Sequence, residues 1–113
     1  QIWQKTVHKF SEALAMGDSL MLAEINGQVV GYEWCEIHPR QAHLNRLAVH
    51  PDYQGRGIGA QLLHRALSDV RARGVHKITL NTQEHNHRSI ALYQRFGFEL
   101  TGQRLPVLVK TLG

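Results

Sequence analysis

The sequence predicts an α/β fold in which a mixed, mostly antiparallel sheet is flanked by helices. Two apolar-rich runs are joined by Asn26-Gly27, the strongest short signal for a β-hairpin. An apolar strand end at Leu47 to Val49 leads through a glycine-rich loop into an amphipathic helical pattern. Another β-branched run follows this helix, and the order strand, helix, strand implies a right-handed crossover between parallel strands.

The composition indicates one ordinary globular domain. A chain of 113 residues is long enough to bury a core without disulfides, so we expect a single domain over residues 1–113. The only cysteine, Cys35, cannot form an internal disulfide, which points to a reducing compartment and to a buried structural thiol. The sequence contains no membrane-length apolar run and no signal-peptide pattern, so the expected location is the cytoplasm.

The formal net charge of +4 makes an anionic partner plausible. Lys and Arg are scattered without a basic run or an aromatic-interleaved groove pattern, which argues against nucleic acid. The basic balance therefore favours a small polyanionic ligand.

The first half of the chain predicts one helix and three strands. The helix is expected to end near Met16-Gly17, because apolar residues recur before it at helical spacing: Ile2, Trp3, Val7, Phe10, Leu14 and Ala15. The hairpin strands are expected over Ser19 to Ile25 and Gln28 to His38. The third strand runs from Ala42 to Val49, and strict alternation along it places His43, Asn45, Leu47 and Val49 on one face.

The second half predicts a long helix, a strand, a short helix and two final strands. The long helix follows the glycine loop and ends at Gly74, its apolar stripe being Ile58, Leu62, Leu63, Ala66, Leu67 and Val70. A strand is expected over Val75 to Thr82. Asn86 and Gly97 bracket the short helix as N-cap and C′ residue. Two short strands fill Glu99 to Leu112, joined around Leu105-Pro106.

The glycine loop predicts an anion site. The first amides of a helix have no intrahelical acceptor and lie at the positive end of the helix dipole, so they converge on a phosphate. Glycines at 55, 57 and 59 keep side chains away from those amides, and Arg56 adds a charge.

Three kinds of phosphate loop compete for this segment. A P-loop needs Lys and then Ser or Thr after its last glycine, where this chain has Ala60-Gln61. A dinucleotide fingerprint is formally matched, but Asn81 and Thr82 occupy the strand end where the ribose-binding acid is expected. The third pattern, Q-x-x-G-x-G, is carried by Gln54, Gly57 and Gly59.

With L-A-V-H-P before it and L-L after it, this segment resembles the coenzyme A pyrophosphate loop of the GNAT superfamily of acyl-CoA-dependent N-acyltransferases. A second signature of that superfamily, N-x-x-x-x-x-x-Y-x-x-x-G-F, runs from Asn86 to Phe98. The resemblance implies a GNAT-like mixed sheet with a parallel, splayed central strand pair. Members usually begin with a strand and a helix that are not seen here. Either this chain is a fragment or second domain of a longer protein, or the first strand is missing.

The resemblance also implies acetyl-CoA as co-substrate and assigns its binding residues. The acyl-pantetheine arm is expected between the splayed strands, where a main-chain N–H near Leu47 polarises the thioester carbonyl. The full expected set is Leu47, Ala48, Val49, Gln54, Gly55, Arg56, Gly57, Ile58, Gly59, Ala60 and Asn86.

Two catalytic residues follow from the same resemblance. The Tyr93 hydroxyl is expected to hydrogen-bond the coenzyme sulfur and assist the departing thiolate. His43 is the leading base for the incoming amine, because some members place Glu or His there and imidazole accepts a proton near neutrality; a water or an acidic residue remains the alternative. Ribosomal-protein N-terminal acetyltransferases carry their Glu base where this chain has Asn81, which cannot take a proton.

The function predicted from the sequence is acetyl transfer from acetyl-CoA to a primary amine of a small molecule or peptide. The alternative is a non-catalytic acyl-CoA sensor of the same fold, and a dinucleotide binder ranks third. The tail loop is shorter than in many members, which leaves the acceptor groove open or completed by a homodimer partner. His85 and His87 flank a cap residue without further ligands, so no metal site is expected.

Overall fold

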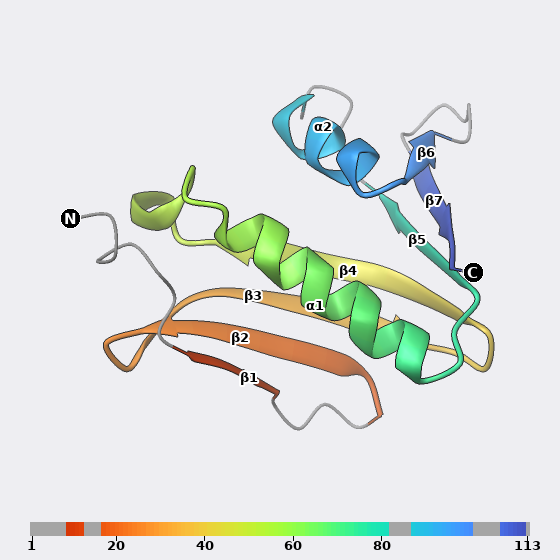
Figure 1. The fold of residues 1–113 in the computed structure, drawn as a ribbon, viewed down its shortest axis with the longest axis horizontal. Coiled ribbons are helices and arrows are strands. Elements are labelled where there is room, and N and C mark those ends of the chain that lie inside the picture. Colours follow the sequence, from red (N-terminus) through yellow and green to blue (C-terminus); the bar gives the residue numbers. More distant parts are fainter. Residues whose placement is uncertain (1–8, 13–16, 82–86, 101–106, 113) are drawn as a thin grey trace.

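The computed structural model describes residues 9–12, 17–81, 87–100 and 107–112 (Figure 1). Within these residues seven strands form one sheet in the order β1-β2-β3-β4-β5-β7-β6. The elements in chain order are β1 (Lys9–Glu12), β2 (Ser19–Ile25), β3 (Gln28–Ile37), β4 (Gln41–Val49), a 3-10 turn (Pro51–Tyr53), α1 (Ile58–Ala72), β5 (Lys77–Asn81), α2 (His87–Arg95), β6 (Glu99–Leu100) and β7 (Val107–Thr111). The mixed α/β fold class is confirmed.

The predicted hairpin between β2 and β3 is present. Asn26 and Gly27 both adopt positive φ, at 53° and 76°, which is the conformation of a two-residue hairpin turn. This local backbone preference fixes the pairing of Ile25 with Gln28 and sets the register of the whole ribbon.

The predicted N-terminal helix is wrong where the structure describes it. Residues Lys9–Glu12 form strand β1, which pairs antiparallel with β2 in the register Lys9 to Glu24 and Glu12 to Met21. The free edge of β2 offers backbone hydrogen bonds to this segment, and Phe10 packs against the core beneath α1. Tertiary pairing therefore overrides the helical spacing of the apolar residues. The rest of the predicted helix lies outside the described residues.

The predicted parallel pair is β4 with β5, in the register Gln41 to Lys77 through Leu44 to Leu80. Pairing ends there, although β4 continues to Val49. In the described residues, the last five residues of β4 have no strand partner on the β5 side. The two strands thus separate at Leu44, and the backbone of β4 beyond it is left for another partner.

A β-bulge in β4 corrects the prediction that His43 shares a face with Leu47 and Val49. Trp34 pairs with Arg46 and Cys35 with Leu44, so Asn45 is an extra residue in β4. Ala42 and Leu44 face the core before the bulge, whereas Leu47 and Val49 face it afterwards. A single extra residue reverses the alternation, so His43 lies on the sheet face opposite to Leu47.

Both helices pack on one face of the sheet, because Leu63 of α1 and Tyr93 of α2 belong to the same core cluster. In Figure 1, α1 crosses β2, β3 and β4 while α2 lies beside β5 and β7. Close packing of α1 depends on Gly31, where an added Cβ would lie 3.0 Å from the Ala48 carbonyl oxygen and 3.1 Å from Leu62. No helix among the described residues is long and apolar enough to span a membrane.

Candidate active site

The start of α1 presents uncapped backbone amides. Gly57 is the N-cap residue with a φ of 81°, and it makes no side-chain cap hydrogen bond. Gly55 also has positive φ, at 79°. These two glycines allow the loop to turn left-handed in front of the helix. Gly59 differs, because its φ is not positive and an added Cβ would make ordinary contacts of 3.8 Å with Val49 and Leu92.

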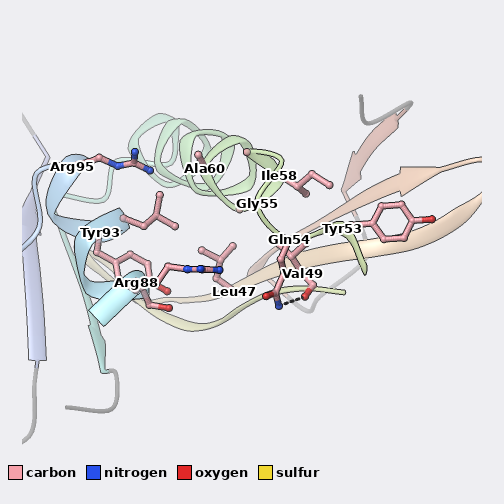
Figure 2. Close-up of a pocket in the computed structure, with 14 residues that line it drawn as sticks. Leu47, Val49, Tyr53, Gln54, Gly55, Ile58, Ala60, Arg88, Tyr93 and Arg95 are labelled. Atoms are coloured by element: carbon pink, nitrogen blue, oxygen red, sulfur yellow. Dashed lines mark hydrogen bonds between the residues drawn. The ribbon is translucent and has the colours of Figure 1, made fainter. Parts of the chain in front are cut away.

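Side chains and main chain of the preceding turn hold this loop in place. The Gln54 side-chain amide donates a hydrogen bond of 2.9 Å to the Val49 carbonyl (Figure 2). The His50 backbone N–H donates to the Val30 carbonyl at 2.7 Å. The His50 imidazole accepts from the Asp52 N–H at 3.1 Å, which caps the 3-10 turn. The loop is therefore tied to the ends of β3 and β4.

A cavity of about 520 Å³, which we call the loop cavity, extends from this loop to α2. Tyr53 lies at one end of the group of lining residues and Tyr93 at the other in Figure 2. The lining residues are Leu47, Val49, Tyr53, Gln54, Gly55, Gly57, Ile58, Gly59, Ala60, Arg88, Ser89, Leu92, Tyr93 and Arg95. The cavity therefore connects the uncapped amides at the start of α1 with the Tyr93 side chain.

The loop cavity is cationic. Arg88 and Arg95 extend from α2 into the space between α2 and the glycine loop (Figure 2). No carboxylate is among the described residues that line the cavity. Together with the helix amides, the two guanidinium groups favour a polyanion. Sequence reasoning missed both arginines, although Arg88, Leu92 and Arg95 form one stripe at helical spacing.

Tyr93 is 8% exposed and packs edge-on against Phe98 at a ring distance of 5.7 Å. Burial raises the pKa of its hydroxyl. The hydroxyl therefore stays protonated at neutral pH and can donate a hydrogen bond to an anion that forms in the cavity.

A second, smaller cavity of about 180 Å³ lies where β4 and β5 separate, and we call it the splay cavity. It shares Leu47, Ser89 and Tyr93 with the loop cavity. Its other lining residues are Leu44, Asn45, Arg46, Leu80 and Asn81. Tyr93 is thus the meeting point of two spaces, one long and one small.

Comparison with known proteins identifies the family. The model of the acetyltransferase (GNAT) family matches residues 3–98, which is most of the chain. The chain belongs to the GNAT family.

Relatives and solved structures agree with this assignment. The GNAT domain is 32% identical over 99 residues to the L-amino acid N-acyltransferase MnaT of Escherichia coli K12, covering 83% of this chain and 58% of that protein. It aligns with a GNAT acetyltransferase from Elizabethkingia anophelis solved with acetyl-CoA bound, at a TM-score of 0.77, 20% identity and coverage of 84% and 76%. It also aligns with Arabidopsis thaliana Naa50 in complex with a CoA-peptide bisubstrate analogue, at a TM-score of 0.75, 28% identity and coverage of 82% and 72%. The chain spans less than two thirds of the length of the curated relatives it matches.

The structure collects most of the predicted GNAT site residues around the loop cavity. The predicted residues that line it are Leu47, Val49, Gln54, Gly55, Gly57, Ile58, Gly59, Ala60 and Tyr93. Ala48 is not among the lining residues and pairs with Tyr32 on the other sheet face. Arg56 is not among them either, and its guanidinium lies over the Tyr53 ring at 5.0 Å. Asn86 lies outside the described residues.

His43 lines neither the loop cavity nor the splay cavity. Its Nδ1 shares a hydrogen bond of 2.7 Å with the Thr79 hydroxyl across the β4–β5 pair. It lies on the same sheet face as Arg46, and its pair with Thr79 is the next to last before the strands separate. Its role as base stays a prediction.

Strand β3 carries a buried acid opposite Leu47 of β4. Glu33 pairs with Leu47 across β3 and β4, is 0% exposed and accepts a 2.8 Å hydrogen bond from the Ser19 hydroxyl. Burial raises the pKa of its carboxyl to about 7, and this acid was not singled out from the sequence. Cys35 is a buried free thiol, as predicted, and burial raises its pKa so that it stays protonated. Among the described residues no group of three or more His, Cys, Asp and Glu side chains could hold a metal ion.

Proposed function

We propose that this GNAT domain transfers an acetyl group from acetyl-CoA to the primary amine of a small molecule or peptide. The observation that carries the proposal is the continuity of the loop cavity, from the uncapped amides of α1 to the buried Tyr93 hydroxyl. The solved neighbours that hold acetyl-CoA or a CoA conjugate support the choice of co-substrate.

The binding end uses backbone groups and cations. The pyrophosphate would be held by the N–H groups at the start of α1, with Arg88 and Arg95 on the opposite wall. The pantetheine arm would run along β4 beyond Leu44, where the main chain has no strand partner on that side in the described residues. Its amide groups would there complete the hydrogen bonds of the strand.

The reacting end is formed by β4 and Tyr93. The amine nitrogen attacks the thioester carbon, a C–N bond forms and the C–S bond breaks. A main-chain N–H of β4 near Leu47 would stabilise the oxyanion, and Tyr93 would donate a hydrogen bond to the departing thiolate. His43 or a water would take the proton from the amine.

Release of free coenzyme A thiol tests the proposal. Acetyl-CoA is incubated with the chain and a panel of small amines, amino acids and short peptides, while thiol is followed with a colorimetric reagent. We expect thiol release that depends on one class of amine and coincides with formation of the N-acetyl product. Binding of acetyl-CoA without thiol release from any acceptor would instead support the sensor function.

A further inference from the structure

The splay cavity opens beside the reacting end of the loop cavity. Among the described residues, the two cavities share Leu47, Ser89 and Tyr93, which is where the proposed thiolate would form. At about 180 Å³ the splay cavity is much smaller than the loop cavity of about 520 Å³. This size suits a small acceptor.

Asn45 places a hydrogen-bond acceptor beside that cavity. It is the extra residue of the β4 bulge, and its side-chain nitrogen donates a 2.7 Å hydrogen bond to the Glu36 carboxylate. A carboxylate can only accept hydrogen bonds, so this contact fixes which end of the Asn45 amide is the oxygen. The oxygen is buried and has no hydrogen-bond partner among the described residues. It suits an N–H of an incoming amine.

Arg46 gives the same cavity a positive charge. It is exposed and is the only charged side chain among the described residues that line the splay cavity. The other polar residues of the lining, Asn45, Asn81, Ser89 and Tyr93, carry no charge. An arginine with no carboxylate beside it in the lining attracts a carboxylate from the ligand and repels a polycation.

We propose, on the basis of the acetyl transfer inferred above, that the acceptor is a small amine that carries its own carboxylate, as a free amino acid does. Arg46 binds the carboxylate, and the Asn45 oxygen receives an N–H of the amine. The nitrogen is thereby directed toward the thioester at Tyr93. A polyamine lacks the group that Arg46 binds.

Matched pairs of acceptors isolate the contribution of the carboxylate. L-Leucine is compared with 3-methylbutylamine, and L-phenylalanine with 2-phenylethylamine, at saturating acetyl-CoA. For the unaltered chain, kcat/KM should be at least about tenfold higher for the acid of the preferred pair. Arg46→Gln should lower the value for the acid about tenfold and leave the amine within about twofold, since a charge-assisted hydrogen bond is lost.

Two further variants separate a loss of carboxylate recognition from a general loss of activity. Asn45→Ala should lower kcat/KM for both members of a pair, because both contain the amine. Arg71→Gln removes an exposed arginine of α1 that lines neither cavity, and it should change neither value. The proposal is wrong if the unaltered chain shows no preference for the acid, or if Arg46→Gln lowers acid and amine alike.

Calorimetry keeps this test independent of turnover. The CoA-loaded chain and its Arg46→Gln variant are titrated with the same acid and amine. Tighter binding of the acid that disappears with Arg46 supports carboxylate recognition, even if no thiol is released and the proposed acetyl transfer fails. Equal binding of acid and amine overturns the recognition proposal, even if acetyl transfer occurs.

Discussion

The two ends of the loop cavity are formed by different kinds of chemical groups. The end at the glycine loop consists of backbone amides, positive-φ glycines and a main-chain carbonyl held by Gln54. The end at α2 consists of side chains, above all Tyr93, over a core that contains Glu33 and Cys35. A backbone site follows from local conformation, whereas a side-chain site depends on how distant elements pack. The two ends should therefore respond differently to substitution.

The largest effect of a substitution on activity is expected at the end of the loop cavity that is formed by side chains of α2. Tyr93→Phe keeps the ring that packs on Phe98 and removes only the hydroxyl. We expect kcat to fall roughly a hundredfold, which is the lower range for a proton donor in catalysis, while the Kd for acetyl-CoA changes less than about twofold. Steady-state kinetics and calorimetry measure the two quantities. An unchanged kcat would mean that Tyr93 contributes to core packing and not to catalysis.

Glu33 should make the stability of this end depend on pH. The folded state, with a pKa of about 7 for Glu33, keeps a proton that the unfolded chain loses near 4.5. The free energy of unfolding should therefore fall as pH rises from about 4.5 to 7, by about 3 kcal/mol from this group. Denaturant unfolding of the unaltered chain and Glu33→Gln should show a smaller fall in the variant. Parallel pH curves would mean that Glu33 is already ionised when folded.

His43 tests whether the face opposite to Leu47 takes part in the reaction. If His43 is the base, His43→Ala should flatten the acidic limb of the pH–rate profile and lower kcat/KM roughly tenfold. Thr79→Val removes its 2.7 Å partner and should have a smaller effect of the same kind. A profile of unaltered shape would assign deprotonation to water or to another group.

At the backbone end, a single methyl group should weaken cofactor binding. Gly57→Ala forces a side chain into positive φ at a cost of about 1–2 kcal/mol and disturbs the first amides of α1, so the Kd for acetyl-CoA should rise about tenfold. Gly17→Ala is a matched control, because Gly17 also has positive φ, at 95°, and open space around it. It should lower stability comparably and leave the Kd unchanged. Equal Kd values for both variants would contradict a role for the loop amides.

The smallest effects are expected for the exposed arginines. Arg88→Gln and Arg95→Gln should each raise the Kd for acetyl-CoA about threefold and reduce its dependence on salt, because exposed charges are screened. Arg71→Gln, which lies away from the cavity, serves as the control. Calorimetry at two salt concentrations measures the change, and a Kd that no arginine variant alters would leave phosphate binding to the amides alone.

The same contrast explains what could be predicted from the sequence. The hairpin at Asn26-Gly27 and the helix start at Gly57 are fixed by residues that favour particular backbone angles, so local patterns identified them. The bulge at Asn45 is not marked by glycine or proline, and it reversed the predicted face of His43. Strand β1 was predicted as a helix because its pairing with β2 is a tertiary effect. Arg88, Arg95 and the buried Glu33 acquire their roles only when α2, β3 and β4 come together.

Calorimetric titration with acetyl-CoA, with NAD titrated in parallel, tests the central claim most directly. The claim is that one cavity joins a phosphate-binding helix start to a reacting tyrosine. We expect micromolar binding of acetyl-CoA, weakened by Gly57→Ala and nearly unchanged by Tyr93→Phe, with no heat from NAD. Binding of NAD without binding of acetyl-CoA would contradict the account.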